Sequence, residues 1–156
     1  MLTGMMLLGL AFAASPQVAL AQSDPFDGIW RLNLAKSKIT GPAAGTKSAT
    51  YYFHGEGQNR KLTALWINAQ GNPGSAVFMH IYDGQPHPTM ESPYYDASTH
   101  TRVDAHTINA SLTKAGKLTM TDTLVVFQDG KTLTITGKGA DANGREYNIV
   151  LVYDKL

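Results

Sequence analysis

The 156-residue chain contains no cysteine. This absence excludes disulfide frameworks, thiolate metal sites and a cysteine nucleophile. It is compatible with export to an oxidising compartment, where a stray thiol is a hazard. The chain therefore relies on an ordinary hydrophobic core, for which one domain of this length is long enough.

Net charge is almost absent as well. The 13 Lys and Arg residues against 12 Asp and Glu residues give a net charge of +1, and the basic residues are scattered along the chain. Nucleic acids and anionic membrane surfaces attract proteins through clustered positive charge. The composition therefore indicates neither a nucleic-acid partner nor an anionic membrane surface.

The first 21 residues lack charged side chains altogether, so no Lys or Arg precedes the apolar run at residues 5–14. That run is too short to span a bilayer, and the small-x-small sequence Ala19-Leu20-Ala21 follows it. This order is typical of a secretory signal peptide, although a buried N-terminal helix is the alternative. We expect a signal peptide at 1–21, a mature domain at 22–156 without a membrane span, and a periplasmic or secreted bacterial protein.

The remaining chain lacks a sustained helical period and alternates with period two between turn signals. Asx-Gly pairs, such as Asp129-Gly130 and Asn143-Gly144, separate alternating segments and are typical of hairpins. The expected strands are 28–33, 47–54, 61–69, 75–82, 85–90, 99–103, 107–113, 117–128, 132–138 and 146–153.

About eight to ten antiparallel strands in up-and-down order form a sheet too long to stay open in so short a chain. Closure removes the edges that would otherwise aggregate. The sequence therefore predicts an all-β protein, a closed up-and-down antiparallel β-barrel. A β-sandwich is the rival architecture.

The opening strand carries a resemblance. Gly28-Ile29-Trp30 resembles the start of lipocalin and calycin barrels, and the longer pattern resembles a family of secreted bacterial lipocalin-like proteins. The matching segments, which cover almost the whole mature chain, are Gly28 with Trp30-Arg31-Leu32-Asn33 and Ala35-Lys36-Ser37, Tyr82-Asp83-Gly84, Asp129-Gly130-Lys131-Thr132-Leu133-Thr134 and Val152-Tyr153-Asp154-Lys155. The resemblance implies the barrel and no settled activity, so function must be argued from the site.

The resemblance also implies that Trp30 plugs one end of the barrel and that a basic side chain from the last strand crosses its indole. Lys155 stands where lipocalins usually offer Arg. A cation over an indole contributes roughly 0.5–2 kcal/mol.

Strand alternation places Phe78, His80 and Tyr82 on one face of segment 75–82, and Met79 and Ile81 on the other. Both faces are apolar enough to be buried, so the pattern does not decide which points inward. The resemblance assigns the His80 face to the lumen, because relatives are polar at the positions of Met79 and Ile81. An outward apolar stripe at those positions indicates a homodimer contact.

His80 beside Tyr82 forms a candidate acid–base pair, because burial lowers the pKa of a histidine and keeps it neutral. The alternative is a core histidine satisfied by a hydroxyl or a water. Asp122 interrupts an apolar face and is the third catalytic candidate, which can orient His80 or meet Arg102 if it points inward. A β-bulge would turn it outward instead.

Arg102 can clamp a carboxylate or phenolate of a ligand, or form a salt bridge on a solvated strand face. The other candidates for ligand binding are lumen aromatics that can equally be plain core: Tyr51, Phe53, Trp66, Phe78 and Tyr147. The five histidines form no His-x-His pair and are spread along separate strands, so we expect no metal site. No cofactor motif is present, and we expect none.

Two function classes follow. The first is a binder that holds a small apolar or aromatic molecule in the lumen. The second is a cofactor-free isomerase or lyase that uses His80 with Tyr82, Asp122 or Arg102. A filled barrel that acts through its outer surface is the third option.

Export is directly testable. We expect the secreted protein to begin near Gln22, because the small-x-small sequence ends at Ala21. N-terminal sequencing of exported protein measures this, and retention of Met1 would overturn it.

Overall fold

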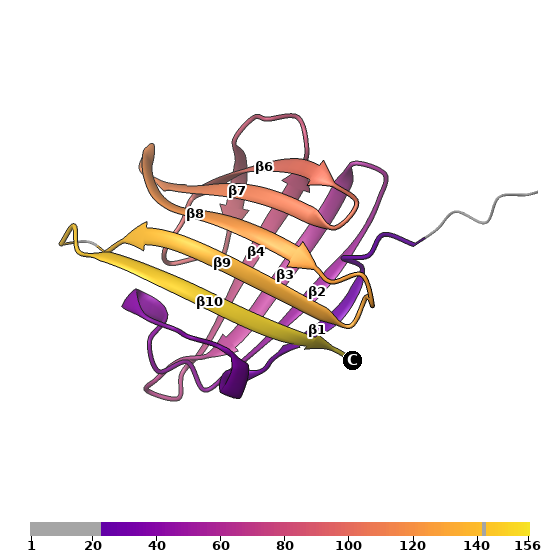
Figure 1. Ribbon diagram of the computed structural model, residues 1–156. Coiled ribbons are helices and arrows are strands. Elements are labelled where there is room, and N and C mark those ends of the chain that lie inside the picture. The colour runs from indigo at the N-terminus through magenta and orange to yellow at the C-terminus, as the bar shows by residue number, and fades with distance from the viewer. Residues whose placement is uncertain (1–22, 142) are drawn as a thin grey trace, which may run out of the picture.

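The computed structural model describes residues 23–141 and 143–156, so the expected signal peptide lies outside the described residues. Ten antiparallel strands close into one barrel in the order β1-β10-β9-β8-β7-β6-β5-β4-β3-β2 (Figure 1). The strands are β1 (Gly28–Leu32), β2 (Ser48–Glu56), β3 (Asn59–Ile67), β4 (Pro73–Ile81), β5 (His87–Met90), β6 (Ala97–Asp104), β7 (Thr107–Lys114), β8 (Lys117–Val126), β9 (Thr132–Ala140) and β10 (Glu146–Lys155). Two 3-10 turns, η1 (Leu34–Lys36) and η2 (Gly41–Ala43), lie between β1 and β2.

The predicted closed barrel is confirmed, and each of the ten expected segments is a strand with slightly shifted ends. The short strand β1 pairs with both β2 and β10, which closes the sheet and excludes the sandwich. Local turns set this order. In the β8–β9 connection Gly130 has a φ of 67°, and the Lys131 amide donates to Asp129 Oδ1 at 2.8 Å. No helix among the described residues is both long and apolar enough to cross a membrane.

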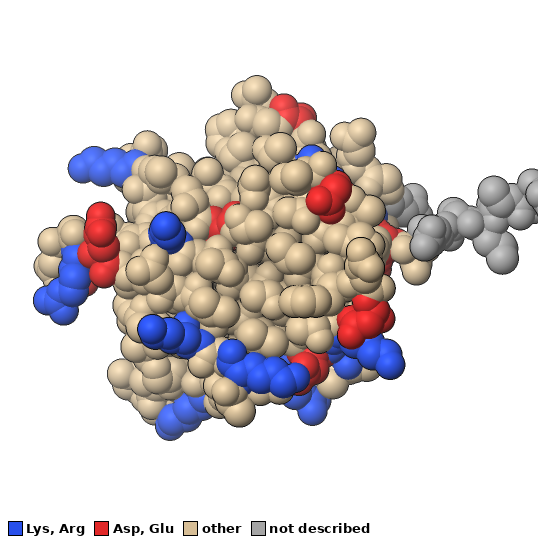
Figure 2. Space-filling model, in the orientation of Figure 1, with Lys and Arg blue, Asp and Glu red and all other residues tan. Residues whose placement is uncertain are grey.

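The outer surface of β7, β8 and β9 is polar mainly through hydroxyl and amide groups rather than charge. Thr123 on β8 donates to Asn109 on β7 at 2.9 Å, and Thr136 pairs with Thr123 from β9. The middle of the face seen in Figure 2 is accordingly tan, with few charged side chains.

A β-bulge occurs in β8, but at Thr119. Leu112 pairs with Met120 whereas Thr113 pairs with Leu118, so β8 has one extra residue at this point. Leu118 is consequently turned outward and is 62% exposed. Met120 and Asp122 remain on the inner face. The bulge therefore leaves Asp122 inside, which decides between the two orientations that the sequence allowed.

One barrel end is closed by Trp30 and Phe26, both fully buried. The Trp30 indole donates to the Phe26 carbonyl at 2.8 Å, and Lys155 Nζ lies 4.8 Å from the centroid of the indole ring. Lys155 therefore occupies the position that the resemblance implies for a basic side chain.

Ion pairs complete this closed end. Asp24, in the segment before β1, contacts Arg102 on β6 at 2.9 Å and Arg60 on β3 at 3.4 Å. Arg60 also pairs with Asp27. The segment that carries Phe26 is thereby held at the barrel end by two non-adjacent strands, β3 and β6.

The plug makes a stability prediction. Trp30→Ala should lower the free energy of unfolding by about 3–5 kcal/mol, as truncation of a large core side chain does. Thermal denaturation should show a midpoint about ten degrees lower or more. Trp66→Ala is the matched control, with a smaller expected loss because Trp66 is only partly buried. A Trp30→Ala midpoint within about two degrees of wild type would contradict the role of Trp30.

Candidate functional site

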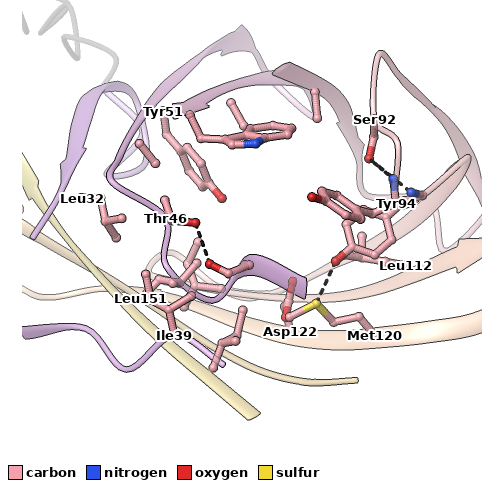
Figure 3. Close-up of a pocket in the computed structure, with 18 of the residues that line it drawn as sticks. Leu32, Ile39, Thr46, Tyr51, Ser92, Tyr94, Leu112, Met120, Asp122 and Leu151 are labelled. Atoms are coloured by element: carbon pink, nitrogen blue, oxygen red, sulfur yellow. Dashed lines mark hydrogen bonds between the residues drawn. The ribbon is translucent and has the colours of Figure 1, made fainter. Parts of the chain in front are cut away.

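A cavity of about 240 Å³ lies inside the barrel, on the far side of the closed end. Inward-facing alanines provide its space, because a larger side chain at any of them would project into the lumen. They are Ala49, Ala64, Ala76 and Ala110. Aromatic rings bound the space, as Figure 3 shows in part: Tyr51, Trp66, Phe78, Tyr94, Tyr95 and Tyr153.

The cavity reaches the molecular surface opposite the plug. Pro42, Ala43 and Ala44, at and after η2, line the cavity and are themselves exposed. The β3–β4 turn contributes Asn68 to Gln70, and the β5–β6 loop contributes Ser92 and the following tyrosines. These connections form the rim, so the lumen has one sealed end and one accessible end.

Asp122 lies on the cavity wall next to Met120 (Figure 3). Its Oδ1 atom is buried and has no hydrogen-bond partner among the described residues. Burial raises the pKa of this carboxyl from 3.8 to about 7. Gly137, its neighbour on β9, leaves the space for the carboxylate, since a Cβ there would collide with Asp122 Oδ1.

Phenols surround this acid. The Tyr51 and Tyr153 rings lie 4.4 Å apart, and the Tyr95 hydroxyl lies 3.1 Å from Met120 Sδ. Burial raises the pKa of Tyr51 to about 12 and raises the pKa values of Tyr95 and Tyr153 as well. These hydroxyls therefore stay protonated at neutral pH and can donate hydrogen bonds into the lumen.

His80 faces the cavity from β4, the inward orientation that the resemblance implies. Its ring stacks on His100 of β6, with centroids 3.7 Å apart and planes inclined by 21°. Burial lowers the pKa of His80 well below 6.5 and the pKa of His100 to about 4, so both are neutral at physiological pH. The Nδ1 atoms of both rings are buried without a hydrogen-bond partner among the described residues.

His100 is the main residue that the sequence interpretation missed. Its face of β6 carries Ser98 and Arg102, so alternation gives no apolar signal. The contact with His80 depends on the four-residue length of β5, because β4 and β6 approach each other beyond it, and no local pattern in the sequence shows this. Tyr94, Tyr95 and Tyr153 were also missed, and the loop position of Tyr94 and Tyr95 gives no periodic cue.

Three of the proposed site residues lie at the closed end instead of on the cavity wall. Phe53 packs against the ring of Phe26, with centroids 5.7 Å apart, as plain core. Arg102 contacts Asp24 and donates to the Tyr82 hydroxyl at 3.5 Å, so its guanidinium binds the chain's own carboxylate. Tyr82 thus partners Arg102 and does not share the cavity with His80.

The remaining placements also correct the proposed constellation. Tyr147 lies at the rim, with its hydroxyl 3.9 Å from Met120 Sδ, and does not line the cavity. Asp122 makes no described hydrogen bond or ion pair with His80 or Arg102. Of the nine proposed residues, those that the cavity brings together are Tyr51, Trp66, Phe78, His80 and Asp122. Their participation in a site stays a prediction.

Comparison with known proteins identifies the class of fold. The sequence matches no protein-family model and no curated protein. Among solved structures it is similar to the zebrafish ileal bile acid-binding protein, crystallised with cholic acid, with a TM-score of 0.51. The likeness covers 85% of this chain and 99% of that chain at 10% sequence identity. At that identity it shows the fold alone: a calycin-type barrel.

The buried acid makes a pH prediction with a definite sign. The raised pKa means that the folded state holds the Asp122 proton more tightly than the unfolded state does. The resulting stabilisation is complete below about pH 4 and is lost as the pH rises through about 7. His80 and His100 act oppositely, because their lowered pKa values cost stability as the pH falls below 6.5.

Asp122→Asn removes the first of these two effects. The free energy of unfolding of the variant, relative to wild type, should increase from about pH 4 to pH 7 by at most about 1.4 kcal/mol per pH unit. Above pH 7 the difference should level off. Urea denaturation across this range measures it, with the exposed Asp129→Asn as control. A difference that is constant with pH would contradict the burial of an unpartnered carboxyl.

Proposed function

We propose that this protein is an exported barrel that binds one small apolar or aromatic molecule in its lumen. The observation that carries the proposal is the cavity of about 240 Å³, lined mainly by aromatic and aliphatic side chains, with polar groups such as Asp122, His80 and His100 on its wall. Ligand pockets have this character and measure about 300–1,000 Å³, so this cavity lies just below their usual range. The size therefore favours a ligand of one or two rings.

The asymmetry of the barrel supports binding. The plug and its ion pairs seal one end, while exposed Pro42, Ala43 and Ala44 border the cavity at the other. A ligand can thus enter from the accessible end and lie against the closed end. The zebrafish neighbour is named for bile acid binding, and the same architecture can hold a small molecule in that protein.

The geometry favours binding over acid–base catalysis. A general base needs an orienting partner within hydrogen-bond reach. His80 instead stacks on a second neutral imidazole, and the centroids of the His80 and Tyr82 rings are 6.4 Å apart. With Tyr82 held by Arg102, the proposed acid–base pair of His80 and Tyr82 does not face the cavity together.

Two parts of the proposal concern the setting of the barrel. A periplasmic or secreted location is supported by the signal-peptide pattern before Gln22. A homodimer contact through Met79 and Ile81 is supported by their position on the outer face of β4, where both side chains are partly exposed.

Filling the cavity should abolish binding. Ala64 is buried on the lumen wall, so Ala64→Leu places a larger side chain where the ligand would lie. Native mass spectrometry of protein purified from its own host should show a co-purifying small molecule with wild type and none with Ala64→Leu. Ala105→Leu, in an exposed turn, is the matched control and should keep the molecule. An equal adduct on Ala64→Leu would place the ligand outside the lumen.

A further inference from the structure

The ionisable side chains that line the cavity include an acid but no Lys or Arg among the described residues. Asp122 is the single acid among these described residues. Arg60 and Arg102, the nearest guanidinium groups to His80, are bound to Asp24 and Asp27 at the closed end. A ligand carboxylate would therefore enter the lumen without a cation to pair with, at a large desolvation cost.

Asp122 offers the complementary feature. Its Oδ1 is buried on the wall without a described partner, in space left by Gly137. An unpartnered buried carboxyl costs stability unless a ligand or a water satisfies it. The atom that satisfies an ionised carboxylate best is a charged hydrogen-bond donor.

We propose that the lumen is selective for small aromatic amines, whose ammonium group pairs with Asp122 while the ring lies between the cavity's aromatic side chains. This inference rests on the proposed small-molecule-binding function. The indole of Trp66 and the rings of Tyr51 and Tyr95 line the same cavity. Their faces attract cations as well as apolar rings, so the wall suits both parts of such a ligand.

The groups that face Asp122 leave its carboxyl free to respond to an amine. Its titratable neighbours are the phenols of Tyr51, Tyr95, Tyr147 and Tyr153, on β2, the β5–β6 loop and β10. The raised pKa values of these phenols keep them neutral, while His80 and His100 on β4 and β6 are neutral because of their lowered pKa values. Amine binding should therefore release the Asp122 proton and strengthen as the pH rises toward about 7.

Three ligands with one ring system test the selectivity: 2-naphthylmethylamine, 2-naphthylmethanol and 2-naphthoate, titrated by calorimetry into the mature protein at pH 7.5. We expect the amine to bind about tenfold to a hundredfold more tightly than the alcohol, the range for a charge-assisted hydrogen bond. The naphthoate should bind more weakly than the alcohol. If alcohol and amine bind equally, or naphthoate binds best, the amine inference fails and the proposed binding function stands. If none of the three binds, both fail.

Asp122→Asn supplies the residue-specific arm. The amine should lose its advantage over the alcohol in this variant, because an Asn side chain carries no charge to pair with the ammonium group. Asp129→Asn carries the same change in charge at an exposed turn and should behave as wild type. Retained amine preference in a folded Asp122→Asn protein would overturn the proposal.

The pH dependence of the wild-type protein needs no variant. Amine affinity should rise by up to about tenfold per pH unit between pH 5.5 and 7, and alcohol affinity should not. An amine affinity that does not change over this range would overturn the proposal independently of how the variants fold.

Discussion

The barrel depends on the pairing of the five-residue strand β1 with both β2 and β10, which closes the sheet. Trp30 lies at the centre of β1, opposite Tyr51 on one side and Lys155 on the other. The same pairing therefore closes the sheet, brings the cation over the indole and fixes Tyr51 in the cavity wall. Leu32, two residues on, pairs with Tyr153, so the tyrosine pair of the lumen is set by the closing strands as well. The register of β1 with β2 and β10 therefore determines both the closure of the barrel and the positions of Tyr51 and Tyr153.

The interior is divided by charge along the barrel axis. Arg60, which belongs to the ion pairs of the closed end, is the cross-strand partner of His80, which faces the cavity. The charged closed end and the neutral part of the cavity therefore meet at this pair of residues. The guanidinium groups of Arg60 and Arg102 are neutralised at the closed end by Asp24 and Asp27, which belong to the segment before β1. Buried arginines without these partners would repel a cation and attract an anion. The segment before β1 therefore controls both the closure of one end and the electrostatics of the lumen.

Local information in the sequence was enough for the fold but not for the site. All ten strands could be predicted because alternation and turns such as Asp129-Gly130 depend on neighbours in the chain. The contacts of Arg102 and His100 depend on β4, β6 and the plug segment, which are far apart in sequence. Asp122 was ambiguous because its orientation depends on a bulge, and no residue type marks Thr119 as the bulged position. The prediction that Tyr82 shares the cavity with His80 was wrong, because a residue at the end of a strand can face the closed end of the barrel as readily as the cavity.

The buried carboxyl is the feature that the barrel itself does not require. Leu124 and Val126 continue the inner face of β8 as ordinary core, and an apolar side chain at position 122 would extend that core. The chain instead keeps an acid there and has no side chain opposite it at Gly137. Both features cost stability or packing when the barrel is considered alone. A ligand that satisfies the carboxylate gives both a common physical reason, because it supplies the hydrogen bond that Asp122 Oδ1 does not make among the described residues.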